Sequence, residues 1–131
     1  MSGNTNRTKG HNAERHYAKE FRDLGFDKVQ TARYGSRIHD DAGIDLINLP
    51  FNVQIKAGRQ RGMNPSKVLS DIKERIPSLF MDNDPVHKNM NILIHKKEVG
   101  RGRPRNEFDE LVHISFEDFK TLISMVNWNQ E

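Results

Sequence analysis

Two polar residues on one predicted strand are the first candidates for chemistry in this sequence. Gln54 and Lys56 lie two residues apart in segment 51–57, where apolar and polar side chains alternate. This alternation predicts a half-buried β-strand, in which residues two apart project from the same face, about 6–7 Å apart. Either residue alone could simply face water, but together they place an amide oxygen and an ammonium group on one patch.

Two acidic residues are expected to approach this patch. Asp45 lies in the apolar run 43–49, which is predicted to be the preceding strand of a hairpin. A carboxylate there needs a cation or a metal, because a buried charge without a partner is costly. Glu14 lies at the edge of the apolar stripe of a predicted helix at 8–24, so it can reach over the sheet if that helix packs on it. The alternative for Glu14 is an exposed first-turn acid that favours the helix dipole.

These four groups form a minimal set for hydrolysis of a phosphodiester. The reaction needs an attacking water, a stabilised pentavalent centre and a neutralised leaving oxygen. Mg²⁺ held by carboxylate, amide and backbone oxygens polarises the phosphate and lowers the pKa of bound water. A lysine beside it orients the water or stabilises the developing charge. We expect Mg²⁺ as the cofactor, with Mn²⁺ able to substitute.

The order of these residues resembles the core of the PD-(D/E)xK nucleases. The matching segments are GHNAER at 10–15, RYGS at 33–36, GIDL at 43–46 and VQIK at 53–56. The first two are similar to segments of the archaeal Holliday-junction resolvases and their phage relatives. The resemblance implies a restriction-endonuclease-like fold, with a central mixed sheet flanked by helices, and a metal-dependent endonuclease that cuts branched DNA.

The resemblance also implies roles for particular residues. The implied metal ligands are three side chains and one backbone carbonyl, namely Glu14, Asp45, Gln54 and the carbonyl of Ile55. Lys56 would be the catalytic lysine, and Ser36 lies in the loop where the resolvases carry a catalytically important serine. The family's usual glutamate in the E-x-K strand is glutamine here, which can bind a metal but brings no negative charge. We therefore expect a variant active site.

Basic residues flank the proposed site in the sequence. Those expected to hold phosphates beside the scissile bond are Lys9, Arg33, Arg37, Arg59 and Arg61. Phosphate contacts give affinity and register rather than sequence reading, which suits an enzyme that selects its substrate by shape. The run GRGRPR at 100–105 adds Arg101, Arg103 and Arg105. We interpret this run as a disordered nucleic-acid-binding arm, with a solubilising loop as the alternative.

Length and composition limit the class of protein. The 131 residues correspond to one domain, in which residues 1–8 are expected to form a flexible arm. No apolar stretch is long enough to span a bilayer, and there is no cysteine for disulfides or thiolate sites. A cytoplasmic protein is expected, and a virus-encoded one acting in a host cell is compatible. The net charge of +3 favours a polyanionic partner, DNA in this case.

The elements that must position these residues alternate between helices and strands. We expect a helix at 8–24, strands at 28–34, 43–49 and 51–57, a helix from 65 to near Pro77, strands at 89–96 and 111–115, and a last helix. Segments 34–43 and 99–106 are expected to be polar loops. Ser115 and Asp118 resemble a capping box that starts the last helix. This order predicts the α/β class, with a central mixed sheet flanked by helices.

The sequence leaves several alternatives open. A restriction- or repair-type nuclease acting on linear duplex fits the motif as well as a resolvase does. A DNA-binding module that has lost catalysis is the third possibility, and Gln54 is its best argument. A resolvase is expected to be a homodimer, because two symmetric cuts need two active sites facing one junction. Its dimer surface could come from Phe80, Met81 or the last helix with Trp128.

Neighbouring polar residues offer further alternatives. Asp40 and Asp41 are rivals of Asp45 for the acidic role, but a strand position fixes geometry better than a loop tip. His39 could contact a metal with them, although a flexible polar loop is the simpler interpretation. His95, in a predicted strand, is interpreted as a structural histidine.

Overall fold

The computed structural model describes residues 2–58 and 63–128, with side chains from residue 8 onward. Its elements in chain order are α1 (Ser2–Asp23), β1 (Gln30–Thr31), α2 (Ala32–Gly35), α3 (Arg37–Asp41), β2 (Leu46–Ile47), β3 (Asn52–Gly58), α4 (Pro65–Leu79), the 3₁₀ turn η1 (Pro85–Lys88), β4 (Asn91–Lys97), the 3₁₀ turn η2 (Glu107–Asp109), β5 (Glu110–Ile114) and α5 (Phe116–Met125). The expected alternation of major helices and strands is confirmed, and the short helical segments are additions to it.

The strands form one mixed sheet in the order β1-β2-β3-β4-β5. Neighbouring strands are antiparallel except for β3 and β4, which are parallel and are joined through α4. A parallel pair needs such a crossover, because its strands run in the same direction. The α/β class with a central mixed sheet is therefore confirmed.

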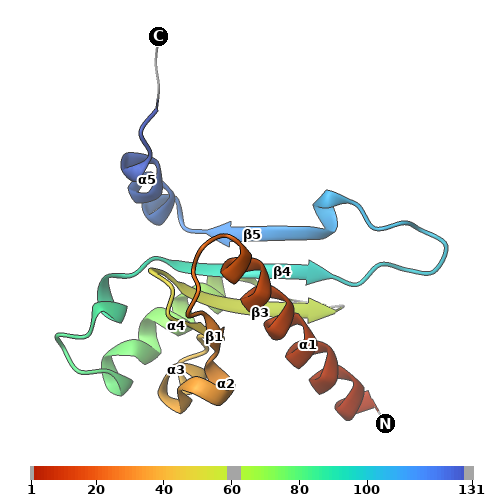
Figure 1. Cartoon of the computed structure of the whole chain (residues 1–131), viewed down its shortest axis with the longest axis horizontal. Helices are drawn as coiled ribbons and strands as arrows, with labels where there is room; N and C mark the ends of the chain where they lie inside the picture. The colour runs from red at the N-terminus through yellow and green to blue at the C-terminus, as the bar shows by residue number, and fades with distance from the viewer. Residues whose placement is uncertain (1, 59–62, 129–131) are drawn as a thin grey trace.

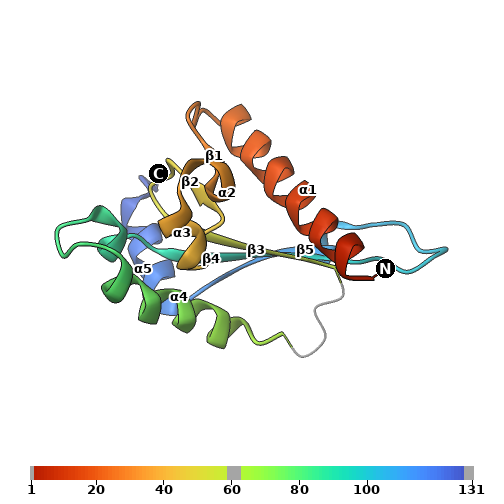
Figure 2. The ribbon, with the colours of Figure 1, turned by 90° about the horizontal axis from the view of Figure 1, so that it is seen from below.

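Helices cover both faces of the sheet, as Figures 1 and 2 show for α1 and α4. Against α1, the buried residues are Ala13, Tyr17, Ala18, Val29, Leu46, Val53, Ile55 and Ile94. Around α4, they are Ala42, Ile44, Ile72, Ile76, Phe80 and Val86. Since Val53 and Ile55 face α1, the alternation of β3 turns Gln54 and Lys56 toward the opposite face. This arrangement agrees with the alternation in the sequence.

Helix α1 ends where the sequence predicts but begins earlier. Gly25 has φ of +113° and follows the last turn, where the amide of Phe26 donates to the carbonyl of Phe21 at 3.1 Å. This is a glycine-terminated helix end. The helix begins at Ser2, within the segment 1–8 that was expected to be a flexible arm. Extending an existing helix adds a hydrogen bond for each residue without a new nucleation step.

The segment before β3 differs most from the prediction. The expected strand at 28–34 is limited to β1, because α2 begins at Ala32, and the expected loop at 34–43 contains the end of α2 and all of α3. The expected strand at 43–49 is limited to β2, because residues with positive φ lie on both sides of it. Gly43 has φ of +85° and Asn48 has φ of +68°. Extended pairing is interrupted at such residues, since the left-handed region is incompatible with a strand.

The C-terminal half follows the prediction closely. Asn64 caps α4, which continues two residues beyond Pro77 to Leu79. The side chain of Ser115 accepts a hydrogen bond from the amide of Asp118 at 3.0 Å, which caps α5. Phe80 is buried, so the suggestion that it contributes to a dimer surface is wrong, whereas Met81 and Trp128 are exposed. No helix in the described ranges has both the length and the apolar character needed to cross a membrane.

Candidate functional site

Asp45 is held by the backbone of the strand that carries Gln54 and Lys56. It directly precedes β2, and its carboxylate oxygen Oδ2 accepts a hydrogen bond from the amide of Ile55 at 2.7 Å. Its own amide donates to the carbonyl of Val53 at 2.7 Å. The carboxyl group is thus fixed against the middle of β3, as the hairpin prediction requires, although only two residues after it form a strand.

Burial makes this carboxyl group a weaker acid than an ordinary aspartate. Shielding from water raises the pKa of Asp45 from 3.8 to about 7. The amide of Ile55 and the charge of Lys56 act against this rise, whereas the charges of Glu14 and Asp40 add to it. The charges of Glu14, Asp40 and Lys56 therefore all act on Asp45. Asp40, the rival of Asp45 for the acidic role, is close enough to influence its pKa.

Glu14 is buried and has a cationic partner. The nitrogen Nη2 of Arg33 in α2 lies 3.0 Å from Oε1 and 2.7 Å from Oε2 of Glu14. Glu14 is 7% exposed, so the alternative of a solvent-facing acid in the first turn is excluded. Burial lowers the pKa of Arg33, but hydrogen bonding to Glu14 and the charges of Glu14, Asp40 and Asp45 outweigh it, and the pKa is raised. Arg33 is therefore bound to an acid of the site rather than free for a phosphate.

Gln54 lies against Gly43 together with a residue that the sequence did not single out. A methyl group at Gly43 would lie 3.5 Å from Oε1 of Gln54 and 3.3 Å from Nη1 of Arg75. Arg75 comes from α4, so this helix contributes a guanidinium to the face that carries Gln54 and Lys56. No signal in the sequence identifies Arg75, because it is one of several polar residues on an amphipathic helix.

A second residue beside Lys56 comes from β4. His95 is the direct register partner of Lys56 in the parallel pair. Its side chain is buried, and within the described residues its atom Nε2 has no hydrogen-bond partner. Burial lowers its pKa, and the neighbouring His113 and Lys97 lower it further. His95 is therefore a neutral imidazole within the sheet, in keeping with the structural role expected from the sequence.

Ser36 and His39 form a local cap. Ser36 precedes α3, and its oxygen Oγ lies 2.7 Å from Nδ1 of His39 and accepts from the His39 amide at 3.4 Å. The ring of His39 packs edge-on against Phe80 at 4.9 Å between centroids. Both residues thus stabilise the α3 turn, and the expectation that His39 lies in a flexible loop is wrong. Arg37 is exposed at the start of the same helix.

The oxygen atoms at this site can bind a divalent cation that takes only a few of its ligands from the protein. Among the described residues, no group of three or more His, Cys, Asp or Glu side chains is close enough to hold a metal ion. Mg²⁺, however, is commonly held by one or two carboxylates completed by water and substrate oxygens. Asp45 has one carboxylate oxygen bonded to the Ile55 amide and lacks a cationic hydrogen-bond partner among these residues. Its half-buried carboxyl group, which other charged side chains surround, fits a divalent cation.

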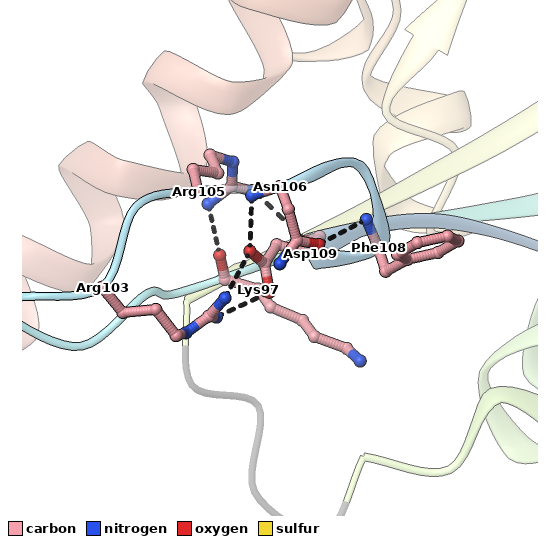
Figure 3. Close-up of polar contacts among 6 residues, drawn as sticks. All are labelled: Lys97, Arg103, Arg105, Asn106, Phe108 and Asp109. Carbon is pink, nitrogen blue, oxygen red and sulfur yellow. Dashed lines mark hydrogen bonds and ion pairs between the residues drawn. The ribbon is translucent and has the colours of Figure 1, made fainter.

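The basic run at 100–105 is organised by contacts within the protein (Figure 3). Arg103 donates to Oδ1 and Oδ2 of Asp109 at 2.7 and 3.1 Å. Arg105 donates to the carbonyls of Lys97 and Asp109 at 2.7 and 3.1 Å. These contacts contradict the interpretation of this run as a disordered arm, because the buried Asp109 fixes it to the end of the sheet.

The remaining predicted phosphate contacts divide into three groups. Lys9 in α1 forms an ion pair of 3.1 Å with Glu98, and Arg101 is exposed. Arg59 and Arg61 lie outside the described residues.

Searches with this chain found no matching protein-family model, no matching curated protein and no matching solved structure.

Proposed function

We propose that this chain is a divalent-metal-dependent endonuclease with a restriction-endonuclease-like fold, similar to the Holliday-junction resolvases, that hydrolyses phosphodiester bonds of branched DNA. The observation that carries the proposal is the position of the Asp45 carboxyl group, which is held by the Ile55 amide between Gln54 and Lys56 and interacts electrostatically with Glu14, Asp40 and Lys56. The residues come from three separate segments of the chain. A cluster that concentrates negative charge around a buried carboxyl group is costly for folding alone, which favours a role in binding a cation.

The proposal assigns a role to each group. Asp45, Glu14, the amide oxygen of Gln54 and the carbonyl of Ile55 would hold Mg²⁺ or Mn²⁺. The bound cation would polarise the phosphate and lower the pKa of a water molecule. Lys56 would orient the attacking water or stabilise the charge that develops on the phosphate. Arg33, which neutralises Glu14 in the protein alone, would exchange this partner for the substrate phosphate when a cation takes its place.

A catalytically inactive DNA-binding module is the second candidate. It is favoured by the two hydrogen bonds between Arg33 and Glu14, which satisfy that carboxylate without a metal. Gln54, with its neutral side chain, favours it as well. In this case the acidic cluster would serve to position Arg33, and Lys56 would contact a phosphate without supporting hydrolysis.

We also propose that the active form is a homodimer. The support is the apolar side of α5, where large side chains remain exposed, namely Phe116, Phe119, Leu122 and Met125. Figure 1 shows α5 at the end of β5, standing away from the rest of the sheet. A soluble protein rarely leaves such a helix face uncovered, since contiguous exposed apolar surface marks interaction sites.

Cleavage of a synthetic four-way junction in Mg²⁺ or Mn²⁺ tests the proposal, with linear duplex and single strand of the same sequence beside it. The variants are Lys56→Ala and Asp45→Asn, and the control is Lys73→Ala on the exposed side of α4. Symmetric cuts in the junction that both site variants lose and the control keeps are the expected result. Equal cutting of linear duplex would favour a restriction- or repair-type nuclease. Tight binding without cleavage in any metal would favour the inactive module.

A further inference from the structure

A basic groove lies beside the candidate site, at the ends of β3 and β4. Its volume is about 660 Å³, and three segments contribute cationic side chains to it. These are Lys9 from α1, Lys96 and Lys97 from β4, and Arg103 and Arg105 from the loop that follows β4. Among the residues that the structure describes, Glu98 is the single acidic residue in the lining. Figures 1 and 2 show the N-terminal half of α1 crossing the ends of these strands.

The cations of the groove differ in how far their charge is already neutralised. Arg103 is paired with the carboxylate of Asp109, and Lys9 with Glu98. The Lys9–Glu98 pair is largely exposed, and such pairs contribute little to stability, so Lys9 can change its partner at low cost. Lys96 and Lys97 form no ion pair in the part of the chain that the structure describes, although Glu110 lies opposite Lys96 in the pairing of β4 with β5. The groove lining therefore carries a net positive charge.

Arg105 adds a fixed charge to one wall of the groove (Figure 3). Its two terminal nitrogens donate to the carbonyls of Lys97 and Asp109, at 2.7 and 3.1 Å. These acceptors are neutral, so they orient the guanidinium without forming an ion pair with it, while the Asp109 carboxylate nearby interacts with its charge. Its remaining N–H groups stay available, because a guanidinium has five donors in a fixed fork. A pre-oriented cation of this kind is suited to bind phosphate oxygens.

The groove adjoins the candidate site along two elements of the chain. Ala57 and Gly58 line it, and they directly follow Lys56 on β3. Ala13 lines it as well, next to Glu14 on α1. On the same side of α1, Lys9, Asn12 and His16 occur at helical spacing, so they present donors along more than one turn. A strand bound in the groove would thus lie next to segments of β3 and α1 that carry residues of the candidate site.

We infer that this groove binds the sugar–phosphate backbone of a nucleic acid strand, with Lys96, Lys97 and Arg105 as its main phosphate contacts. This rests on the proposed function only in the claim that the bound strand continues into a cleavage site. A polymer suits the groove because its charges are spread over three segments instead of converging on one point. Contacts of this kind are independent of base sequence and depend strongly on salt.

The test measures binding of labelled single-stranded and duplex DNA in EDTA, so that no cleavage occurs. The groove variant is Lys96→Glu with Lys97→Glu, and the matched control is Lys28→Glu with Lys73→Glu. The control changes the net charge equally at exposed lysines outside the groove. Circular dichroism and thermal unfolding of all proteins verify that they are folded.

We expect the groove variant to bind at least about ten-fold more weakly, with a fall of about two in the slope of log K against log salt concentration. The control should stay close to wild type. Equal weakening in both double variants would overturn the inference, because general charge would then explain binding. Displacement of DNA by poly-glutamate of matched charge would also overturn it, in favour of an acidic protein partner. Binding of inorganic phosphate by a protein that does not bind DNA would overturn it too.

The two proposals fail in different ways. If the wild-type protein cleaves DNA in Mg²⁺ and the groove variant binds DNA normally, the inference about the groove is contradicted and the proposed nuclease activity is supported. Binding that depends on Lys96 and Lys97, without cleavage in any metal, would support the groove and contradict the nuclease. Asp45→Asn, measured in EDTA, should bind DNA as wild type does, since that residue lies outside the groove lining.

Discussion

The Nη2 atom of Arg33 lies within hydrogen-bond distance of both carboxylate oxygens of Glu14, at 3.0 and 2.7 Å. The pair joins α2 to α1, and Glu14 is buried at one end of the acidic cluster. In the protein alone, Arg33 therefore neutralises Glu14, as a metal ion bound to Glu14 would do. Much of the behaviour expected of this site depends on the competition between the guanidinium and a cation.

Replacing Arg33 by alanine should destabilise the protein and strengthen binding of Mn²⁺. The lost partner leaves a buried carboxylate uncompensated, which should cost about 1–3 kcal/mol in free energy of unfolding, given that Arg33 is one-third exposed. A divalent cation should restore much of this loss, because a ligand of the folded state stabilises it. Urea unfolding with and without Mn²⁺ measures both effects. Arg37→Ala is the control, and equal metal affinity in wild type and Arg33→Ala would contradict the competition.

The raised pKa of Asp45 predicts a pH-dependent stability. The folded pKa of about 7 lies above the ordinary value of 3.8, so between these pH values the folded state binds more protons than the unfolded state. Ionisation is thus unfavourable in the folded protein, and stability should fall as pH rises from about 4 to about 7. The contribution is at most about 4 kcal/mol, from 1.36 kcal/mol for each pKa unit.

Asp45→Asn isolates this effect, because an asparagine keeps an oxygen that can accept from the Ile55 amide but does not titrate in this range. In EDTA, the variant should match wild type near pH 4 and be the more stable protein near pH 8. Mg²⁺ should reverse the order at high pH by stabilising the ionised wild type. A difference in free energy of unfolding between the two proteins that stays constant from pH 4 to 8 would contradict the raised pKa of Asp45.

Gln54→Glu should increase the affinity for a divalent cation, because it adds a negative charge to a cluster that already holds three acids. The guanidinium of Arg75 lies near the same glycine as Gln54, so the new carboxylate has a compensating charge at hand. Isothermal titration with Mn²⁺ measures the change, which should exceed about ten-fold. Gln30→Glu on β1 is the matched control. Unchanged affinity would argue that position 54 is not a ligand and would favour the inactive module.

Local periodicity predicted much of the fold. The alternation in β3 assigned Val53 and Ile55 to one face and Gln54 and Lys56 to the other, and α1 and α5 followed from their spacing and caps. The convergence of Asp45 with β3 was also predictable, since the hairpin depends on short-range sequence signals.

The remaining features depend on tertiary contacts. Gly43 and Asn48 adopt positive φ in the folded chain and shorten β2, although both positions fit a strand by pattern. In the sequence Arg33 is one of several basic residues, and only the folded structure places it against Glu14. In the same way, the basic run at 100–105 is fixed by Asp109, whose burial no local pattern reveals.

Arg103→Ala should loosen the loop between β4 and β5, whereas Arg101→Ala in the same loop should not. Arg103 donates to both oxygens of Asp109, and this hydrogen bonding, with that of the Asn106 amide, lowers the pKa of Asp109 to about 2. Its contribution to stability is therefore present above pH 3.8 and is lost as pH falls through about 2. Hydrogen–deuterium exchange of residues 98–109 at neutral pH should be faster in Arg103→Ala than in wild type. Equal exchange in the two arginine variants would contradict the role of Asp109 as the anchor.

Substitutions on α5 test the homodimer. Phe119 and Leu122 lie on the exposed apolar side of the helix, whereas Thr121 is polar and exposed. If the apolar side is a dimer surface, Phe119→Glu with Leu122→Glu should give a monomer, since buried carboxylates in an apolar interface are costly. Thr121→Glu is the control and should keep the wild-type mass. Sedimentation velocity over a range of concentrations measures the change, and a monomeric wild type throughout would contradict the dimer. Because two symmetric cuts need two sites on one junction, the monomeric variant should nick one strand and release no paired products.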